Sequence, residues 1–133
     1  MIDANKLVRQ YVDTITKRYA IDVEKYREWN KYVDLETQCI CQIKQTADWI
    51  NIVYPLLNHK HVGVKMNIAM ILLPYKTRRA KWELWKCRLL DSGMYSFEAG
   101  IILQEWRSGE LKFPEFNKNG KVVYKSRDEL SKN

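Results

Sequence analysis

Apolar residues recur at intervals of three and four along most of the chain, which is the spacing of one face of an α-helix. The first such stripe predicts a helix that follows Asp3, a residue suited to cap its N-terminus. Its apolar positions are Val8, Tyr11, Val12, Ile15 and Tyr19. Periodicity therefore favours an α-helical beginning of the chain.

A second, longer helix is predicted from about residue 22 to residue 45. Its stripe comprises Tyr26, Trp29, Asn30, Val33, Thr37, Ile40 and Cys41. Because Asn30 falls within this stripe, we expect its amide to be buried and to hold a neighbouring backbone turn through hydrogen bonds.

Two further helices are predicted around the first two prolines. The earlier one carries Ala47, Ile50, Val53, Tyr54 and Leu57. Pro55 does not fit its interior, so we expect a kink or an early end there, followed by a tight connection over residues 58–61. The later one carries Val64, Ile68, Ala69, Ile71 and Leu72, and Pro74 ends it.

The last two predicted helices are bounded by glycines. Thr77 is expected to cap a helix that reaches about Asp91, with Gly93 as its C-terminal stop. The next helix ends at Gly109 and carries Tyr95, Ala99, Ile102, Leu103 and Trp106. Beyond it, Asn119-Gly120 is a strong turn signal, so residues 113–124 form either a small hairpin or an extended tail. We expect residues 125–133 to be frayed.

These elements predict an all-α fold of about six antiparallel helices. A shift of 30 residues superposes Ile50 on Ala80, Leu57 on Cys87 and Ala69 on Ala99. This favours helix pairs stacked as short HEAT/ARM-like repeats over an ordinary bundle. We expect one helical-repeat domain over residues 1–109 and a partly ordered C-terminal extension over residues 110–133.

Composition narrows the class of protein. The chain has 133 residues, of which 46% are hydrophobic and 29% charged, as in a globular protein. The sequence contains no apolar run that approaches the length of a membrane span and no signal peptide at its beginning, so we expect a soluble, cytoplasmic protein without membrane contact. Cys39, Cys41 and Cys87 lack framework spacing, which indicates reduced and mostly buried thiols.

Positive charge is concentrated in one segment. The net charge is +7, and residues 58–88 hold eight Lys and Arg against Glu83 alone, which is 8 − 1 = +7. The rest of the chain is balanced. Such a field attracts nucleic acid or an acidic protein surface, although a solvated helix face would have the same composition.

The helix predicted from residue 77 has two apolar faces, and the basic residues lie between them. Ala80, Leu84 and Cys87 form one face, and Trp82, Trp85 and Leu89 form the other. Two interpretations are open. Either this is an inner helix covered on both sides, or Trp82 and Trp85 are partly exposed beside cations and form an interaction surface.

Signatures of catalysis are absent from the sequence. It contains no phosphate-binding glycine loop, HExxH, GxSxG or CxxC. Cys39 and Cys41 are two residues apart on a predicted helix and point about 200° apart, which argues against a metal site with His59 and His61. We therefore expect no enzyme activity, no metal and no cofactor.

The stretch from Trp49 to Gly109 resembles a family of bacterial HEAT/ARM-like helical-repeat domains of unknown function that is similar to immunity proteins of polymorphic toxin systems. The matching residues are Leu56 to His59, Val64-Lys65, Ala69 to Leu73, Ala80, Leu84, Ser92-Gly93, Phe97 to Ala99, Leu103 to Trp106 and Gly109. Lys65 stands where such repeats usually place Arg. The resemblance implies a cytoplasmic binding protein that occludes a toxin domain.

The leading hypothesis is thus a non-enzymatic protein-binding module, an immunity or accessory protein whose partner has an acidic surface. The alternative is a nucleic-acid-binding repeat protein that uses the basic segment 58–88. A third possibility is a structural subunit, and the oligomeric state is open. The candidate partner-binding residues are Lys65, Arg78, Arg79, Lys81, Trp82, Trp85, Lys86 and Arg88.

Overall fold

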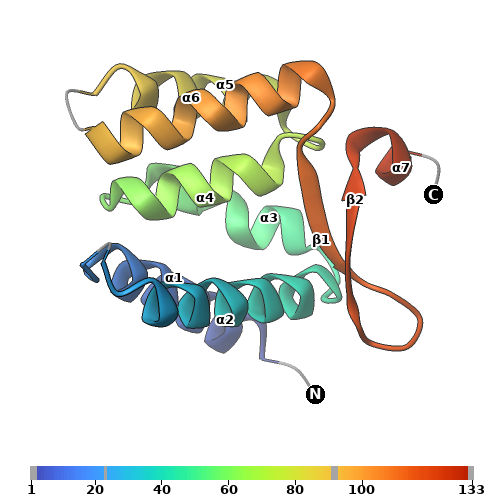
Figure 1. Cartoon of the computed structure of the whole chain (residues 1–133). Helices are drawn as coiled ribbons and strands as arrows, with labels where there is room; N and C mark the ends of the chain where they lie inside the picture. Colours follow the sequence, from blue (N-terminus) through green and yellow to red (C-terminus); the bar gives the residue numbers. More distant parts are fainter. Residues whose placement is uncertain (1–2, 23, 91–92, 132–133) are drawn as a thin grey trace. The chain divides into compact units, whose positions relative to one another are not determined.

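A computed structural model describes residues 3–22, 24–90 and 93–131 (Figure 1). The described helices are α1 (Ala4–Tyr19), α2 (Tyr26–Lys44), α3 (Trp49–Val53), the 3₁₀ helix η1 (Tyr54–Asn58), α4 (Val62–Leu72), α5 (Thr77–Arg88), α6 (Gly93–Ser108) and α7 (Arg127–Ser131). Strands β1 (Lys112–Phe116) and β2 (Val122–Ser126) pair as a hairpin. The prediction of a mainly helical fold is confirmed, and of the two forms expected for the tail the hairpin is the one observed.

The chain divides into two compact units. One comprises Met1–Ile52 and Pro114–Val123, and the other comprises Val53–Phe113 and Tyr124–Asn133. The expected boundary at residue 109, between a repeat domain and an extension, stays a prediction.

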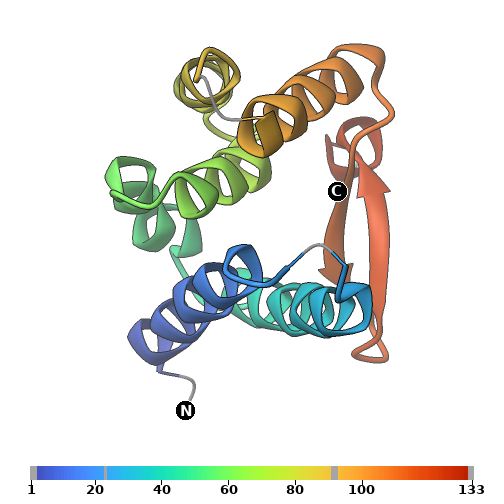
Figure 2. The same cartoon turned by 60° about the vertical axis from the view of Figure 1, so that its left-hand side comes forward.

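In the first unit, α1 packs along α2 (Figures 1 and 2). Asp3 caps α1 as expected, because its Oδ1 accepts from the backbone N–H of Asn5 at 3.1 Å. Arg18 and Glu36 form a buried, bidentate ion pair between the two helices. The Arg18 guanidinium also lies 4.8 Å from the centre of the Trp29 ring. This pairing offsets the desolvation of both charges at the helix interface.

The end of α2 contacts strand β1 in the same unit. Lys44 Nζ donates to the carbonyl oxygen of Pro114 at 3.0 Å and lies 3.9 Å from Glu115 Oε1. Burial lowers the pKa of Lys44, and the charge of Glu115 opposes that shift.

In the second unit, α4 is the inner helix. Nearly every side chain of α4 is buried, including Val64, Ile68 and Leu72, because η1, α5 and α6 all pack against it (Figures 1 and 2). A helix that is apolar all round is buried all round. The polar Asn67 is accommodated because its Nδ2 donates to the carbonyl oxygen of Gly63 at 2.7 Å.

Several local predictions are confirmed. The α-helix predicted to end early or kink at Pro55 ends at Val53, and Pro55 lies in the first turn of the 3₁₀ helix η1 that follows. Helix α6 stops at Ser108, and Gly109 adopts a φ of +82°, a left-handed conformation that favours glycine. All three cysteines are buried with free thiols.

Other local predictions are wrong. Asn30 is exposed, because α2 begins only at Tyr26 and its buried side chains lie in its second half. Thr77 does not cap α5. Its hydroxyl donates back to the carbonyl oxygen of Leu73 at 2.7 Å, and Lys76 occupies the N-cap position. Helix α5 ends at Arg88, whereas Asp91 lies outside the described residues, and Gly93 begins α6 instead of stopping α5.

The predicted fraying of residues 125–133 is wrong for the part that is described. Strand β2 runs to Ser126, and α7 follows immediately. Residues 132 and 133 lie outside the described part of the chain. None of the described helices combines the length and the apolar character needed to span a membrane.

Candidate binding groove on α5 and α6

Helix α5 buries one face only. Ala80, Glu83, Leu84 and Cys87 are buried, whereas Trp82 and Trp85 are 57% and 48% exposed. The interpretation of α5 as an inner helix covered on both faces is therefore wrong, and that position belongs to α4. The second apolar face of α5 is a surface that carries two tryptophans.

The basic residues of α5 fall into two groups, and the first neutralises a buried carboxylate. Glu83 Oε1 lies 3.0 Å from Arg79 Nη2 and 2.9 Å from Lys86 Nζ. Arg79 also donates to Asn58 Oδ1 at 2.8 Å. Because Glu83 is buried, these two cations are needed to stabilise its charge. Their role in the structure is internal to the fold.

The second group lines a groove of about 960 Å³ between α5 and α6. Among the described residues, the lining contains three tryptophans and five cations, and no carboxylate. The described residues of the lining are Arg78, Lys81, Trp82, Trp85, Arg88, Gly100, Leu103, Gln104, Trp106, Arg107 and Arg127. A groove with this composition concentrates positive potential beside large aromatic surfaces.

Arg88 is stacked in the wall of this groove. Its guanidinium carbon lies 5.4 Å from the centre of the Trp85 ring. A Cβ atom on Gly100 would lie 3.6 Å from Arg88 Nη1, so the guanidinium rests against the bare backbone of α6. A guanidinium held between a ring and a helix keeps its hydrogen-bonding edge available for a carboxylate or a phosphate, at a low entropic cost.

Arg127 forms a second stack of the same kind. Its guanidinium carbon lies 4.9 Å from the centre of the Trp106 ring. The Trp106 ring also makes an edge contact with the ring of the buried Phe113, and the two ring centres are 6.3 Å apart. Trp106 is therefore fixed by the core beneath it, and Arg127 lies over a rigid ring.

A capping box positions Arg127. The Ser126 N–H donates to Glu129 Oε1 at 3.1 Å, and the Glu129 N–H donates to Ser126 Oγ at 3.3 Å. These reciprocal bonds define the first turn of α7, in which Arg127 is the first residue. The hydrogen bonds from Ser126 lower the pKa of the Glu129 carboxyl, and Lys112, 3.6 Å away, adds to this effect.

The structure brings together five of the eight residues that the sequence singled out: Arg78, Lys81, Trp82, Trp85 and Arg88. It does not place Lys65, Arg79 and Lys86 in the lining. Sequence reasoning missed Gly100, Leu103, Gln104, Trp106, Arg107 and Arg127. The spacing of Gly100, Leu103 and Arg107 is typical of one helix face, and Ser126-x-x-Glu129 is a capping-box signature, so both signals were present.

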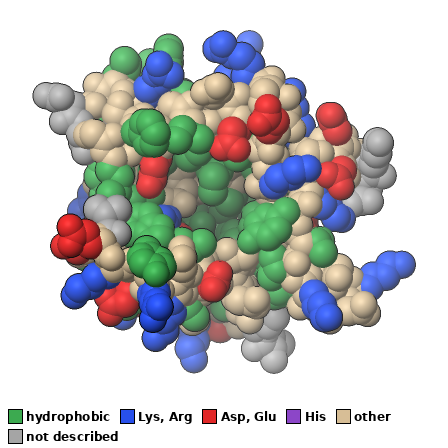
Figure 3. Space-filling view, viewed as in Figure 1, with side chains coloured by type: hydrophobic (Ala, Val, Ile, Leu, Met, Phe, Trp, Pro, Cys, Tyr) green, Lys and Arg blue, Asp and Glu red, His purple; other side chains and the backbone are tan. Residues whose placement is uncertain are grey.

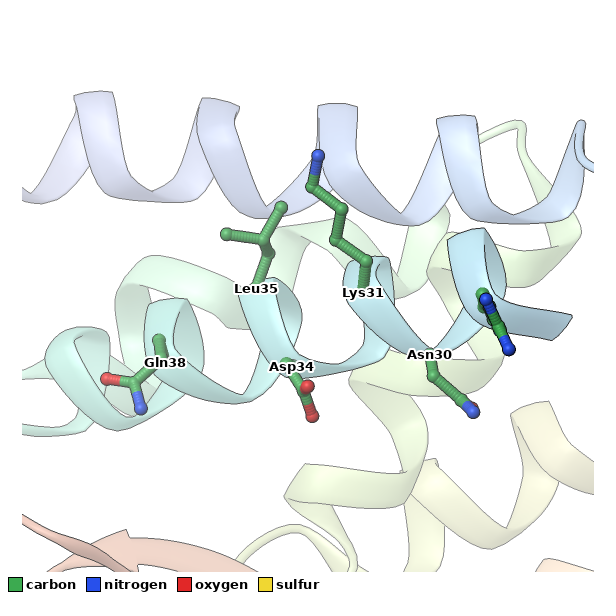
Figure 4. Close-up of a pocket in the computed structure, with 6 residues that line it drawn as sticks. Asn30, Lys31, Asp34, Leu35 and Gln38 are labelled. Atoms are coloured by element: carbon green, nitrogen blue, oxygen red, sulfur yellow. The ribbon is translucent and has the colours of Figure 1, made fainter.

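A second, smaller groove follows α2 and has a volume of about 470 Å³. The described residues that line it come from that one helix: Arg27, Asn30, Lys31, Asp34, Leu35 and Gln38. Lys31 and Leu35 project to one side of α2, and Asn30, Asp34 and Gln38 project to the other (Figure 4). The side chains described in its lining have mixed charges and include no aromatic ring, so it is a weaker candidate than the groove on α5 and α6.

Comparisons of the chain with protein-family models, with curated proteins and with solved structures find no match. Within the described residues, no group of three or more His, Cys, Asp and Glu side chains is arranged to hold a metal ion. The groove on α5 and α6 is therefore the feature of the chain that indicates a function.

Proposed function

We propose that this chain is a non-enzymatic binding module whose α5/α6 groove docks an acidic protein partner. The observation that carries the proposal is the lining of the groove, in which three tryptophans, two of them exposed, lie among five cations and carboxylates are lacking among the described side chains. Tryptophan and arginine are the residue types most enriched among interface hot spots. The cations accelerate encounter with an acidic surface, and the rings provide apolar area to bury.

The rigidity of the site supports tight association. Arg88 and Arg127 are already stacked on Trp85 and Trp106, and the groove is built on packed helices. Side chains that are ordered before binding lose less conformational entropy in the complex. An occluding protein such as an immunity or accessory protein benefits from this property. The HEAT/ARM-like stacking of helix pairs belongs to the same proposal, and the packing of α1 on α2, η1 on α4 and α5 on α6 supports it.

A nucleic acid is the second candidate occupant, and the tryptophans of the groove favour it specifically. Trp82 and Trp85 each expose about half of their surface beside Lys81 and Arg88. Aromatic rings in a cationic groove stack on the bases of single strands. In that case the logarithm of the binding constant would fall steeply and linearly with the logarithm of the salt concentration.

The test is affinity capture from the lysate of the cells that produce this protein, with and without nuclease, read by quantitative mass spectrometry. Three baits are compared: the native chain, the groove variant Lys81→Glu/Arg107→Glu, and the control variant Lys6→Glu/Lys118→Glu. The control changes net charge equally at exposed positions outside the groove.

The proposal expects one protein that is enriched by the native chain and by the control, survives nuclease treatment, and is lost from the groove variant. Enrichment that nuclease removes would overturn the proposal in favour of the nucleic-acid candidate. Enrichment that the groove variant retains would show that the partner binds elsewhere, which also overturns the proposal.

A further inference from the structure

Exposed apolar side chains lie where α5 ends and α6 begins. Leu89 and Phe97 are 75% and 70% exposed, the largest exposed fractions among the large hydrophobic side chains of the described residues. Leu89 follows Trp82 and Trp85 at helical spacing, and Phe97 precedes Gly100 by one turn of α6. Hydrophobic side chains are exposed over the beginning of α6, at the upper left of Figure 3. Leu90, Met94 and Ile101 are also exposed in this part of the chain.

Leu89 and Phe97 lie at the same end of the groove. The hydroxyl of Ser96 donates to the carbonyl oxygen of Arg88 at 2.5 Å, which ties the end of α5 to the first turn of α6. The other end of the groove contains the beginning of α5 and the end of α6, because the two helices run in opposite directions (Figure 1). That end carries four cations among the described lining residues: Arg78, Lys81, Arg107 and Arg127. Four of the five cations in the described lining therefore lie at this end, whereas the exposed apolar side chains lie at the other end beside Arg88.

From this polarity we infer that the occupant is an amphipathic, acidic helix of a partner protein. The inference rests on the proposed function and names the chemistry of the partner. Its apolar residues cover Trp85, Leu89 and Phe97, and its carboxylates reach the cationic end. A third helix fits the groove between two packed helices by ridges-into-grooves packing, which is an established mode of peptide recognition.

The apolar end discriminates between the two classes of partner. The phosphates of a nucleic acid gain nothing from covering Leu89 and Phe97, and the aliphatic Leu89 offers its bases no ring to stack on. An amphipathic helix buries these side chains, and the burial contributes roughly 25 cal/mol for each Å² of apolar surface. Helix α5 has 12 residues and is about 18 Å long, so a helix of about 12 to 16 residues matches the groove.

The test is a fluorescence-anisotropy titration of the full chain with three labelled probes. The first is a peptide of about 16 residues with Leu and Phe at i, i+3, i+4 and i+7 and with Glu on both flanks. The second is a scrambled peptide of the same composition, which retains the charge and loses the apolar stripe. The third is an oligothymidylate of matching length.

Two protein variants accompany these probes. Leu89→Gln/Phe97→Gln removes the apolar end of the groove, and Tyr26→Gln/Leu35→Gln removes two exposed apolar side chains of α2 as the matched control. We expect the amphipathic peptide to bind the native chain and the control at least about tenfold more tightly than the scrambled peptide does. We expect the Leu89/Phe97 variant to lose that preference.

Equal binding of the two peptides would overturn the inference, because charge alone would then explain the association, and the proposed function would stand. No binding of the amphipathic peptide up to about 100 µM would overturn the inference as well, while the capture experiment judges the proposed function independently. Tighter binding of the oligothymidylate than of either peptide would contradict both.

Discussion

The guanidinium carbon of Arg127 lies 4.9 Å from the centre of the Trp106 ring. A residue of the short helix α7 thereby completes a groove whose other walls are α5 and α6. Five residues are too few for a stable isolated helix. The position of Arg127 therefore depends on the capping box of Ser126 and Glu129 and on the ion pair of Glu129 with Lys112.

Removal of the capping hydroxyl should weaken binding without unfolding the protein. In Ser126→Ala the N-terminus of α7 loses about 1 kcal/mol of local stabilisation, so Arg127 leaves the Trp106 ring for part of the time. We expect a several-fold loss of affinity for the acidic amphipathic peptide, measured by anisotropy, and a similar loss in Arg127→Gln. The control Ser131→Ala removes a hydroxyl at the other end of α7, which donates to the carbonyl oxygen of Asp128. A loss of the same size in the control would contradict this account.

Two substitutions at Gly100 should distinguish an effect on folding stability from an effect on binding. A Cβ atom at this position meets Arg88 at an ordinary van der Waals distance of 3.6 Å, so Gly100→Ala fits the helix. We expect the free energy of unfolding to rise by about 0.5–1 kcal/mol through helix propensity, with binding nearly unchanged. Gly100→Leu should displace the Arg88 guanidinium and lower affinity about tenfold or more. Thermal unfolding and peptide titration measure the two effects, and equal binding by the two variants would refute the role of Gly100.

Neutralising the two groups of cations on α5 should have different effects: loss of the first group should lower folding stability, and loss of the second should abolish binding. In Arg79→Gln/Lys86→Gln the buried Glu83 loses both partners, which should cost about 3–5 kcal/mol of folding stability. In Lys81→Gln/Arg88→Gln stability should change by about 1 kcal/mol or less, because these side chains are exposed, and binding should be lost. Urea unfolding and capture of the partner distinguish the outcomes. Similar stability of the two variants would show that Glu83 does not depend on its cations.

Burial of the thiols should make stability fall at alkaline pH. Desolvation raises the pKa of Cys39, Cys41 and Cys87, and for Cys41 the value is about 11. The unfolded chain releases these protons near the ordinary value of about 8.5–9, whereas the folded chain retains them. The contribution is therefore fully present below about pH 9 and is lost as the pH rises toward 11.

Lys44 has the opposite effect on stability. Because its pKa is lowered in the folded protein, the free energy of unfolding rises with pH until the pH reaches the ordinary pKa of lysine. A comparison with Cys41→Ala isolates the thiol, because Lys44 is retained in both proteins. Urea unfolding at pH 8, 9 and 10 measures the free energy of unfolding of both proteins. We expect it to fall with pH in both, and to fall less in Cys41→Ala, by on the order of 1 kcal/mol at pH 10. Parallel declines would mean that the Cys41 thiol ionises as easily in the folded state as in the unfolded one.

Much of the helical framework could be predicted from the sequence because its signals are local. The Asp3 cap, the end of a helix before Pro55 and the left-handed Gly109 each follow from backbone chemistry within a few residues. The boundaries that failed depend on competition between neighbours. Thr77 bonds back to Leu73 instead of capping, and Gly93 begins a helix, since a glycine after a helix is compatible with either role.

Only the part of the candidate site that α5 contributes could be predicted from the sequence. Two apolar faces on that helix indicated either full burial or exposed tryptophans, and the choice depended on which helix is central in its unit. The charge concentration over residues 58–88 did not separate Arg79 and Lys86, which stabilise Glu83, from Lys81 and Arg88, which face the groove. The contribution of Arg127 required the packing of α7 near Trp106, a contact between residues far apart in the sequence.

The most direct test of the central claim is photo-crosslinking from inside the groove. Gln104 is exposed and lines the groove without carrying charge, so it can be replaced by the photoreactive amino acid p-benzoylphenylalanine in the cells that produce the protein. Gln42, exposed on α2, is the control position. The account predicts an adduct at position 104 that resists nuclease, is removed by protease and is absent at position 42. An adduct that nuclease removes, or equal adducts at both positions, would contradict it.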